Sequence, residues 1–352
     1  MYIKRLVTLT AAFLLPVFCL CVPVNACIVF TQNDGGTVLA GNNEDWMYSC
    51  ESTMSIIAPQ KGSYGRVCFY NLSFVQGGMN EYGLFYDGAF CPNSEVPQTN
   101  GKRQLGMDLG EQVLSECANV EDVIKMLEDS NVPSDFSDHL LFADASGKSA
   151  VFEWMEGKLH IIRKDQSYQL ITNFWLTDKS LGNYPCSRFS TADTMLKKQK
   201  LSVEGFANIL NATKQNWGGG GTLYSNVYDL AKRTVYVFYN GKLDSAYKVD
   251  LASQFHSMKA GDIVEKPIKN LEFNVPVVID ASIKSAVSLP ADSSQTVSAQ
   301  DMQSIENRKS PASSSASAVE PILQGTWYFP AIILFVIAVL TALIWNHRKK
   351  NF

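Results

Sequence analysis

The residue at position 27 constrains this chain most, because a secretory signal peptidase would leave it as the N-terminus of the mature protein. Residues 1–26 begin with a basic pair, continue as an apolar stretch and end in Val24-Asn25-Ala26, the pattern of a secretory signal peptide. Cleavage after Ala26 gives Cys27 a free α-amine beside its thiol. The first strand of the fold would then begin at a residue that holds both a nucleophile and a general base, without a histidine partner.

A β-hairpin is predicted directly after this cysteine. Two β-rich runs, 27–31 and 37–41, flank the turn sequence Asn33-Asp34-Gly35-Gly36. With the turn centred between Asp34 and Gly35, antiparallel pairing places Thr31 opposite Val38 and Cys27 opposite Asn42. Residues 42–45 therefore return to the terminal cysteine.

A carboxylate is expected near the α-amine, because this amine must be held in place while it accepts the thiol proton. The intrinsic pKa of an α-amine, about 7.7–8.0, leaves a sizeable minority unprotonated at neutral pH. The hairpin brings Asp45 to this position, and alternation along the strand directs Glu44 to the other face. Asp45 is thus the predicted orienting carboxylate.

Strand patterns and helical patterns alternate along the rest of the body. Strands are expected at 66–70, 72–76, 84–86, 139–144, 150–154, 159–163, 168–172, 222–228 and 234–239, with a turn at 77–80, and paired helices at 107–117, 120–127, 190–199 and 203–212. Blocks of strands that alternate with paired helices predict sheets covered by helices, which is the α+β class.

The C-terminal part predicts a membrane anchor. Residues 281–326 are rich in Ser, Ala and Gln and poor in large apolar residues, as in a low-complexity stalk. Residues 327–345 hold no charge and have the length of one transmembrane helix, and the basic tail 346–352 should stay in the cytoplasm. The domain 27–280 is then expected outside the cytoplasm, periplasmic or extracellular, on a single-pass membrane protein.

The charge distribution excludes nucleic acid as a partner. The formal net charge is −4, but Lys4, Arg5, Arg348, Lys349 and Lys350 lie outside the body, so subtracting these five cations leaves −9 for residues 27–345. An acidic body without a basic aromatic motif is a poor ligand for phosphate backbones. The sequence is compatible with a homo-oligomer but does not define one.

The cysteines and histidines favour neither a metal site nor a defined disulfide framework. Six of the eight cysteines follow the signal sequence, and if Cys27 is a nucleophile an odd number remains for pairing, so one or two bridges stay open. The spacings lack a C-x-x-C pair and the four histidines are scattered, which argues against zinc. No cofactor is predicted.

Several segments in one order resemble a known family. They are the terminal Cys27 with its hairpin, Gly41-Asn42-Asn43-Glu44-Asp45-Trp46, Gly78-Met79-Asn80-Glu81-Tyr82-Gly83-Leu84, Asp144-Ala145-Ser146-Gly147-Lys148 and Leu170-Ile171-Thr172-Asn173. Together they resemble the penicillin V acylase and choloylglycine (bile-salt) hydrolase family, which are N-terminal-nucleophile cysteine hydrolases of linear amides. The resemblance covers about residues 27–239 and implies a four-layer αββα sandwich.

The resemblance also implies a set of site residues. The nucleophile falls on Cys27 and the aspartate that binds its amine on Asp45, in agreement with the hairpin. The asparagine that helps to stabilise the tetrahedral oxyanion falls on Asn173. The late active-site arginine falls on Arg188, in Ser187-Arg188-Phe189, although its separation from Asn173 is much shorter than in the family.

Two positions depart from the family pattern. The family usually has arginine where this chain has Asn42, and Phe90 stands where a second oxyanion donor is often found. Both positions are predicted to contact substrate, and both have lost a polar or charged group. The substrate pocket should therefore differ from those of the penicillin and bile-salt enzymes.

The predicted function is hydrolysis of a small-molecule linear amide by Cys27. Two alternatives use the same fold: an acyltransferase with the same site, and a catalytically silent, membrane-anchored binding domain. A third reading concerns the terminus itself, because Val24-Asn25-Ala26-Cys27 has a passing likeness to a bacterial lipobox. Lipidation there would block the amine and abolish the mechanism.

Overall fold

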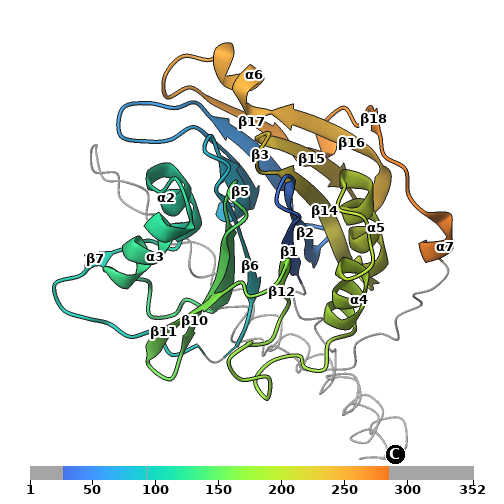
Figure 1. Cartoon of the computed structure of the whole chain (residues 1–352). Helices are drawn as coiled ribbons and strands as arrows, with labels where there is room; N and C mark the ends of the chain where they lie inside the picture. The colour runs from blue at the N-terminus through green and yellow to red at the C-terminus, as the bar shows by residue number, and fades with distance from the viewer. Residues whose placement is uncertain (1–26, 93, 285–352) are drawn as a thin grey trace, which may run out of the picture. The chain divides into compact units, whose positions relative to one another are not determined.

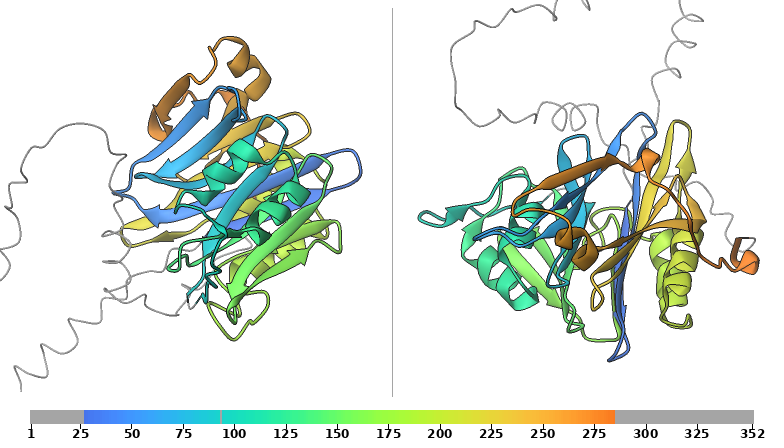
Figure 2. Two further views of the ribbon diagram at one scale, coloured as in Figure 1. Left: turned by 90° about the vertical axis from the view of Figure 1, so that its left-hand side faces the viewer. Right: turned by 90° about the horizontal axis from the view of Figure 1, so that it is seen from above.

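Two antiparallel sheets packed face to face form the centre of the molecule, and a pair of helices covers the outer face of each (Figure 1). The computed structural model describes residues 27–92 and 94–284. Two further views show the same order of layers, with helices outside and sheets inside (Figure 2). The described residues thus have the α+β class and the four layers expected from the sequence.

The first sheet contains the strand that follows Cys27. Its order is β12-β1-β2-β14-β15-β16-β18, with β13 paired to β14. The strands are β1 (Ile28–Asn33), β2 (Val38–Met47), β12 (Tyr168–Ile171), β13 (Asn216–Trp217), β14 (Gly220–Asp229), β15 (Thr234–Tyr239), β16 (Lys242–Asp250) and β18 (Val275–Pro276).

The second sheet has the order β11-β10-β9-β6-β5-β4-β3-β17. Its strands are β3 (Ser52–Ile57), β4 (Arg66–Asn71), β5 (Phe74–Asn80), β6 (Phe85–Phe90), β9 (Asp138–Ala143), β10 (Ser149–Met155), β11 (Lys158–Arg163) and β17 (Ile263–Pro267). A small parallel pair joins β7 (Arg103–Gln104) to β8 (Ser130–Asn131).

The helices lie in two layers. Helices α2 (Leu109–Glu116) and α3 (Val120–Glu128) cover the second sheet, and α4 (Ser187–Leu196) and α5 (Val203–Thr213) cover the first. Capping at two starts follows the sequence: the Asn119 side chain accepts from two N–H groups of α3, and Ser202 accepts from the N–H of Gly205 in α5. The shorter elements are α6 (Leu251–His256), η2 (Ile268–Asn270) and α7 (Ala281–Lys284).

Alternation along the strands separates the core between the sheets from the cores beneath the helices. Val29 faces the opposite sheet, whereas its neighbours Ile28 and Phe30 pack against the helix layer. The aromatic rings of Phe85 and Tyr228 meet across the two sheets with centroids 4.8 Å apart. Cys27 belongs to this inter-sheet core, so the residue at the start of β1 lies between the sheets.

The register of the predicted hairpin is wrong by two residues. Thr31 pairs with Ala40 rather than Val38, because the loop holds four residues, Asp34 to Thr37. The Asp34 carboxylate accepts hydrogen bonds from the N–H groups of Gly36 and Thr37, which stabilises this longer turn. Val29, not Cys27, therefore lies opposite Asn42.

The turn predicted at residues 77–80 is also wrong. These residues belong to β5, and the chain turns after them, at Gly83, whose φ is +78°. The glycines of β5 serve close packing instead: a Cβ at Gly77 would lie 2.2 Å from the Asp87 carboxylate, and one at Gly78 would lie 2.3 Å from the Val67 carbonyl oxygen.

Several predicted segments lie outside the described residues. These are the signal peptide, the transmembrane helix, the basic tail and all of the stalk after Lys284. Within residues 27–92 and 94–284, no helix has both the length and the apolar character needed to cross a bilayer. The first four stalk residues form α7.

Truncation of the inter-sheet core should destabilise the fold strongly. Leu141 on β9 is fully buried between the sheets, so Leu141→Ala should lower the free energy of unfolding by about 2–5 kcal/mol through lost burial and a residual cavity. Urea denaturation measures this change. Leu72, which is 62% exposed, is the matched control, and Leu72→Ala should change the value by about 0.5 kcal/mol or less.

Candidate active site

Cys27 lies at the entrance to β1, and only 7% of its surface is exposed. Its Sγ is 3.7 Å from Oε2 of Glu44 on the neighbouring strand β2. Burial, followed by the charges of Glu44 and Asp45, raises the pKa of this thiol well above its usual value, and the backbone N–H of Asp45 acts in the opposite direction. The thiol is thus a buried group with carboxylates around it.

The expected faces of the two β2 acids are reversed. Residues directly opposite in an antiparallel pair share a face, and the observed register continues to place Cys27 opposite Glu44. Glu44 therefore points toward the thiol, whereas Asp45 points to the side of the sheet that α5 covers. Sequence reasoning missed Glu44 for this reason, although the pairing rule could have found it.

Asp45 is held by two polar side chains. The Thr222 hydroxyl donates to Oδ1, and Gln215 Nε2 donates to Oδ2 at 3.2 Å. Burial raises the pKa of Asp45 to about 7, while the charge of Arg188 and these hydrogen bonds lower it. The carboxylate thus has a fixed orientation and lies within the electrostatic influence of both Cys27 and Arg188.

Arg188 joins three of the residues implied by the resemblance. It is 1% exposed, in the first turn of α4. Its Nη1 donates to the carbonyl oxygen of Cys27 at 2.6 Å, and its Nη2 donates to Oδ1 of Asn173 at 3.1 Å. Asn173 Nδ2 in turn donates to the carbonyl oxygen of Phe90 at 2.9 Å, so Phe90 contacts this group through its backbone.

A buried pair that the sequence did not reveal fixes the segment around Asn173. His139 Nδ1 lies 2.9 Å from Glu153 Oε1, and His139 Nε2 lies 2.6 Å from the carbonyl oxygen of Thr172. Glu153 also accepts hydrogen bonds from the N–H groups of Leu176 and Thr177. Burial opposes ionisation of Glu153, but the hydrogen bond and charge of His139, followed by these two N–H groups, lower its pKa. Two strands of the second sheet thereby hold the chain on both sides of Asn173.

Asn42 lies on β2 on the same face as Glu44 and is 1% exposed. Among the described residues, neither its Nδ2 nor its Oδ1 has a hydrogen-bond partner. It pairs in the backbone ladder with Val29 and with Asn226, whose Oδ1 likewise has no partner within that part of the chain. A buried amide without a partner costs free energy, so packing alone does not explain an asparagine at this position.

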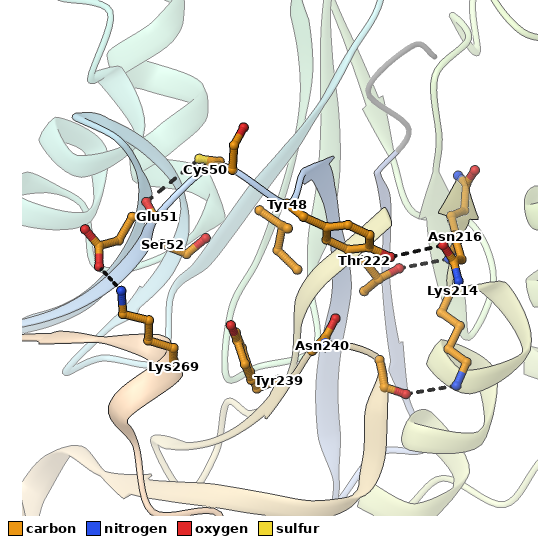
Figure 3. A pocket seen from close by; sticks show the side chains of 14 residues that line it. Tyr48, Cys50, Glu51, Ser52, Lys214, Asn216, Thr222, Tyr239, Asn240 and Lys269 are labelled. Carbon is orange, nitrogen blue, oxygen red and sulfur yellow. Dashed lines mark hydrogen bonds and ion pairs between the residues drawn. The ribbon is translucent and has the colours of Figure 1, made fainter. Parts of the chain in front are cut away.

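A cavity of about 680 Å³ lies beside the segment 48–51 that joins β2 to β3 (Figure 3). Gln215 and Thr222, the partners of Asp45, line it, and so does Ser52, whose hydroxyl donates to Asn71. Asn71 donates to Glu44 at 2.9 Å. Across the cavity, Glu51 and Lys269 form an exposed ion pair, with N and O atoms 2.7 Å apart. The cavity thus reaches Asp45 through its direct partners, and Glu44 only through Ser52 and then Asn71.

Other features of the described residues concern metals and disulfides. No group of three or more His, Cys, Asp or Glu side chains within residues 27–92 and 94–284 could hold a metal ion. The six cysteines in this part of the chain are all unpaired in the structure.

The pH dependence of stability should report the burial of Glu44. Burial and the charge of Asp45 raise the pKa of Glu44 from 4.5 to about 8, so the folded state binds more protons than the unfolded state between these values. The free energy of unfolding should therefore fall as the pH rises through this range, by at most about 1.4 kcal/mol per pH unit from this group.

Glu44→Gln should make this slope shallower, because an amide does not titrate. Denaturant unfolding at pH 5, 6, 7 and 8 measures the slope for both proteins. An equal slope in the variant would contradict a raised pKa at Glu44.

Comparison with known proteins agrees with this geometry. Penicillin V acylase from Agrobacterium tumefaciens superposes with a TM-score of 0.58 at 19% identity, covering 72% of this chain and 99% of that one. A mutant and a variant of conjugated bile acid hydrolase from Clostridium perfringens give TM-scores of 0.54 and 0.56 at 18% and 19% identity, with the same coverage. At such identities the likeness shows the fold, which is that of the N-terminal-nucleophile hydrolases.

No curated protein matches the sequence. A family model described as acyl-coenzyme A:6-aminopenicillanic acid acyl-transferase matches residues 31–244, which is more than half of the chain. The chain therefore belongs to the acyl-coenzyme A:6-aminopenicillanic acid acyl-transferase family and has the fold of penicillin V acylase and conjugated bile acid hydrolase.

Proposed function

We propose that the protein hydrolyses a linear, non-peptide amide with Cys27 as the nucleophile. The observation that carries this proposal is the position of Arg188, which contacts both Cys27 and Asn173 and lies near Asp45. Cys27 and three residues from separate parts of the sequence thus lie together. A buried group of this composition, next to a cavity, is typical of an active site rather than of a packing core.

In the proposed reaction each residue has one role. Cys27 Sγ attacks the amide carbonyl carbon, and the α-amine of the mature Cys27 takes the thiol proton and later gives it to the leaving nitrogen. Asp45 orients that amine. Asn173 has two amide hydrogens, so its contact with Phe90 leaves a second one for the developing oxyanion. Water then hydrolyses the thioester and releases the acid.

An acyltransferase is the second candidate, and the family model favours it, because its description names an acyl transfer. Both reactions share the acylated cysteine and differ only in whether water or an amine accepts the acyl group. A product analysis with and without added 6-aminopenicillanic acid separates them. Transfer to this amine indicates an acyltransferase, and free acid alone indicates a hydrolase.

We further propose that residues 327–345 anchor the protein in a membrane with domain 27–280 outside the cytoplasm. The support is the uncharged apolar run and the basic tail in the sequence. A homo-oligomer is compatible with this arrangement. The substrate is a small molecule, and its acyl group and amine are to be identified with a panel of penicillin V, conjugated bile acids, N-acyl amino acids and N-acyl homoserine lactones.

Loss of the thiol should abolish the activity. Cys27→Ala should lower kcat for any amide of this panel by at least about a thousandfold, because no acyl-enzyme can form. Incubation with a β-lactam followed by mass measurement of the N-terminal peptide should show an acyl group on Cys27 in the wild type only. Cys117→Ala, which changes a thiol in the outer helix layer, is the control and should retain activity.

An unmodified, free Cys27 together with no turnover would favour a silent binding domain. A diacylglyceryl mass on Cys27 would identify a lipoprotein and exclude the proposed mechanism.

Asn42→Ala should weaken substrate binding and have little effect on the stability of the fold. Because neither polar atom of Asn42 has a partner among the described residues, Asn42→Ala should change the free energy of unfolding by only about 1 kcal/mol or less. If the amide contacts substrate, the same variant should raise KM severalfold. Steady-state kinetics and urea denaturation measure both effects, and an unchanged KM would remove Asn42 from the site.

A further inference from the structure

Glu44 occupies a position that the proposed reaction does not yet use. It lies on β2, is 1% exposed, and its Oε2 is 3.7 Å from the Sγ of Cys27. This contact is on the opposite face of β2 from Asp45. The thiol thus has one carboxylate directly at its sulfur, while the other carboxylate serves the side of the strand near Arg188.

The carboxylate of Glu44 is held by a chain of hydrogen bonds that ends at the cavity. Asn71 Nδ2 donates to Oε1 at 2.9 Å, which leaves Oε2 directed at the thiol. Ser52 Oγ donates to Asn71 Oδ1 at 2.7 Å and thereby fixes the orientation of the Asn71 amide. Ser52 lines the cavity of about 680 Å³. These hydrogen bonds therefore fix the orientation of the Glu44 carboxylate.

The surroundings of Glu44 favour its protonated form. The titratable groups that interact electrostatically with Glu44 are carboxyl groups, thiols and tyrosine hydroxyls from several strands and one loop. They are Cys27, Asp45, Cys50, Tyr86, Asp87, Asp138, Tyr224 and Tyr228. The charge of Arg188 acts on the neighbouring Asp45. Burial together with the charge of Asp45 raises the pKa of Glu44 to about 8, so it can both take and return a proton near neutral pH.

We propose that Glu44 takes the proton of the Cys27 thiol, and that Asn71 and Ser52 are positioning residues for its carboxylate. This inference rests on the proposed function in one respect, namely that Cys27 is the nucleophile. It adds a second proton acceptor beside the α-amine.

The second acceptor matters in molecules whose α-amine is protonated while the Glu44 carboxylate is ionised. In those molecules the thiol proton passes to Glu44 Oε2 while the bond between Sγ and the carbonyl carbon forms. The ammonium group then gives a proton to the leaving nitrogen as the carbon–nitrogen bond breaks. In the second half, water gives a proton to the amine as it attacks, and Glu44 returns its proton to Sγ as the thioester bond breaks.

The rate of Cys27 acylation by penicillin V in a single turnover tests the proposal, with the N-terminal peptide measured by mass spectrometry. Glu44→Gln keeps the shape and the contact with Asn71 but cannot take the thiol proton while the bond between Sγ and the carbonyl carbon forms. Acylation at pH 8 should therefore become about tenfold slower. Alkylation by iodoacetamide between pH 6 and 10 reports the pKa of the thiol in the same proteins.

A purely electrostatic neighbour gives the opposite result. Removal of the Glu44 charge lowers the pKa of the thiol, because that charge raises it, so acylation would then become faster or stay equal. An acylation rate in Glu44→Gln that equals or exceeds that of the wild type would therefore overturn the proposal. A wild-type Cys27 that reacts with iodoacetamide but is never acylated would instead mark a failure of the proposed function.

Two further variants complete the test. Asn71→Ala should lower the acylation rate by a smaller factor, and it serves as the decisive measurement if Glu44→Gln does not fold. Glu116→Gln removes an exposed carboxylate that pairs with Arg103 on the outer helix layer, and it should leave the acylation rate unchanged. An unchanged rate in Asn71→Ala would remove Asn71 as a positioning residue.

Discussion

The contact of Arg188 with the start of β1 is the constraint on which the arrangement of this site depends. One guanidinium group, buried at the beginning of α4, bonds the carbonyl of Cys27 and the side chain of Asn173. A planar cation with a fixed set of donors fits two acceptors at once, which a lysine would not reproduce. The helix layer, the first strand and the end of β12 are thereby held in one geometry.

This cation also explains how two neighbouring acids can be buried together. Glu44 and Asp45 are adjacent on β2, and each is at most 1% exposed. Alternation along the strand sends their side chains to opposite faces, so each finds its own partners: Asn71 for Glu44, and Thr222 with Gln215 for Asp45. The charge of Arg188 lowers the pKa of Asp45, whereas the carboxylate of Asp45 raises the pKa of Glu44. One strand thus supplies an acid with a nearby cation to one face and an acid with a pKa of about 8 to the other.

Local patterns in the sequence predict the strands and helices but not their register. The helix at 203–212 and the strand at 234–239 agree with α5 and β15, because periodicity is a local property. The predicted register of the hairpin was wrong by two residues. A shift of two residues keeps every side chain on the same face, so the hydrophobic pattern does not reveal it. The Asn173 and Arg188 positions came from a family resemblance alone. No local sequence pattern indicates the pair of His139 and Glu153, because the two residues lie on strands that only the folded sheet brings together.

Asn42, which stands where the resemblance implies an arginine, fits the charge of the space between the sheets. Glu44 and Asp87 already lie there, and burial together with the charge of Glu44 raises the pKa of Asp87. A cation at position 42 would stabilise the ionised forms of both acids and hence lower their pKa values. With a neutral amide at Asn42, Glu44 keeps a pKa of about 8, in the range where it can exchange a proton with a thiol. The loss of the arginine and the proton-taking role proposed for Glu44 are therefore two consequences of the same local electrostatics.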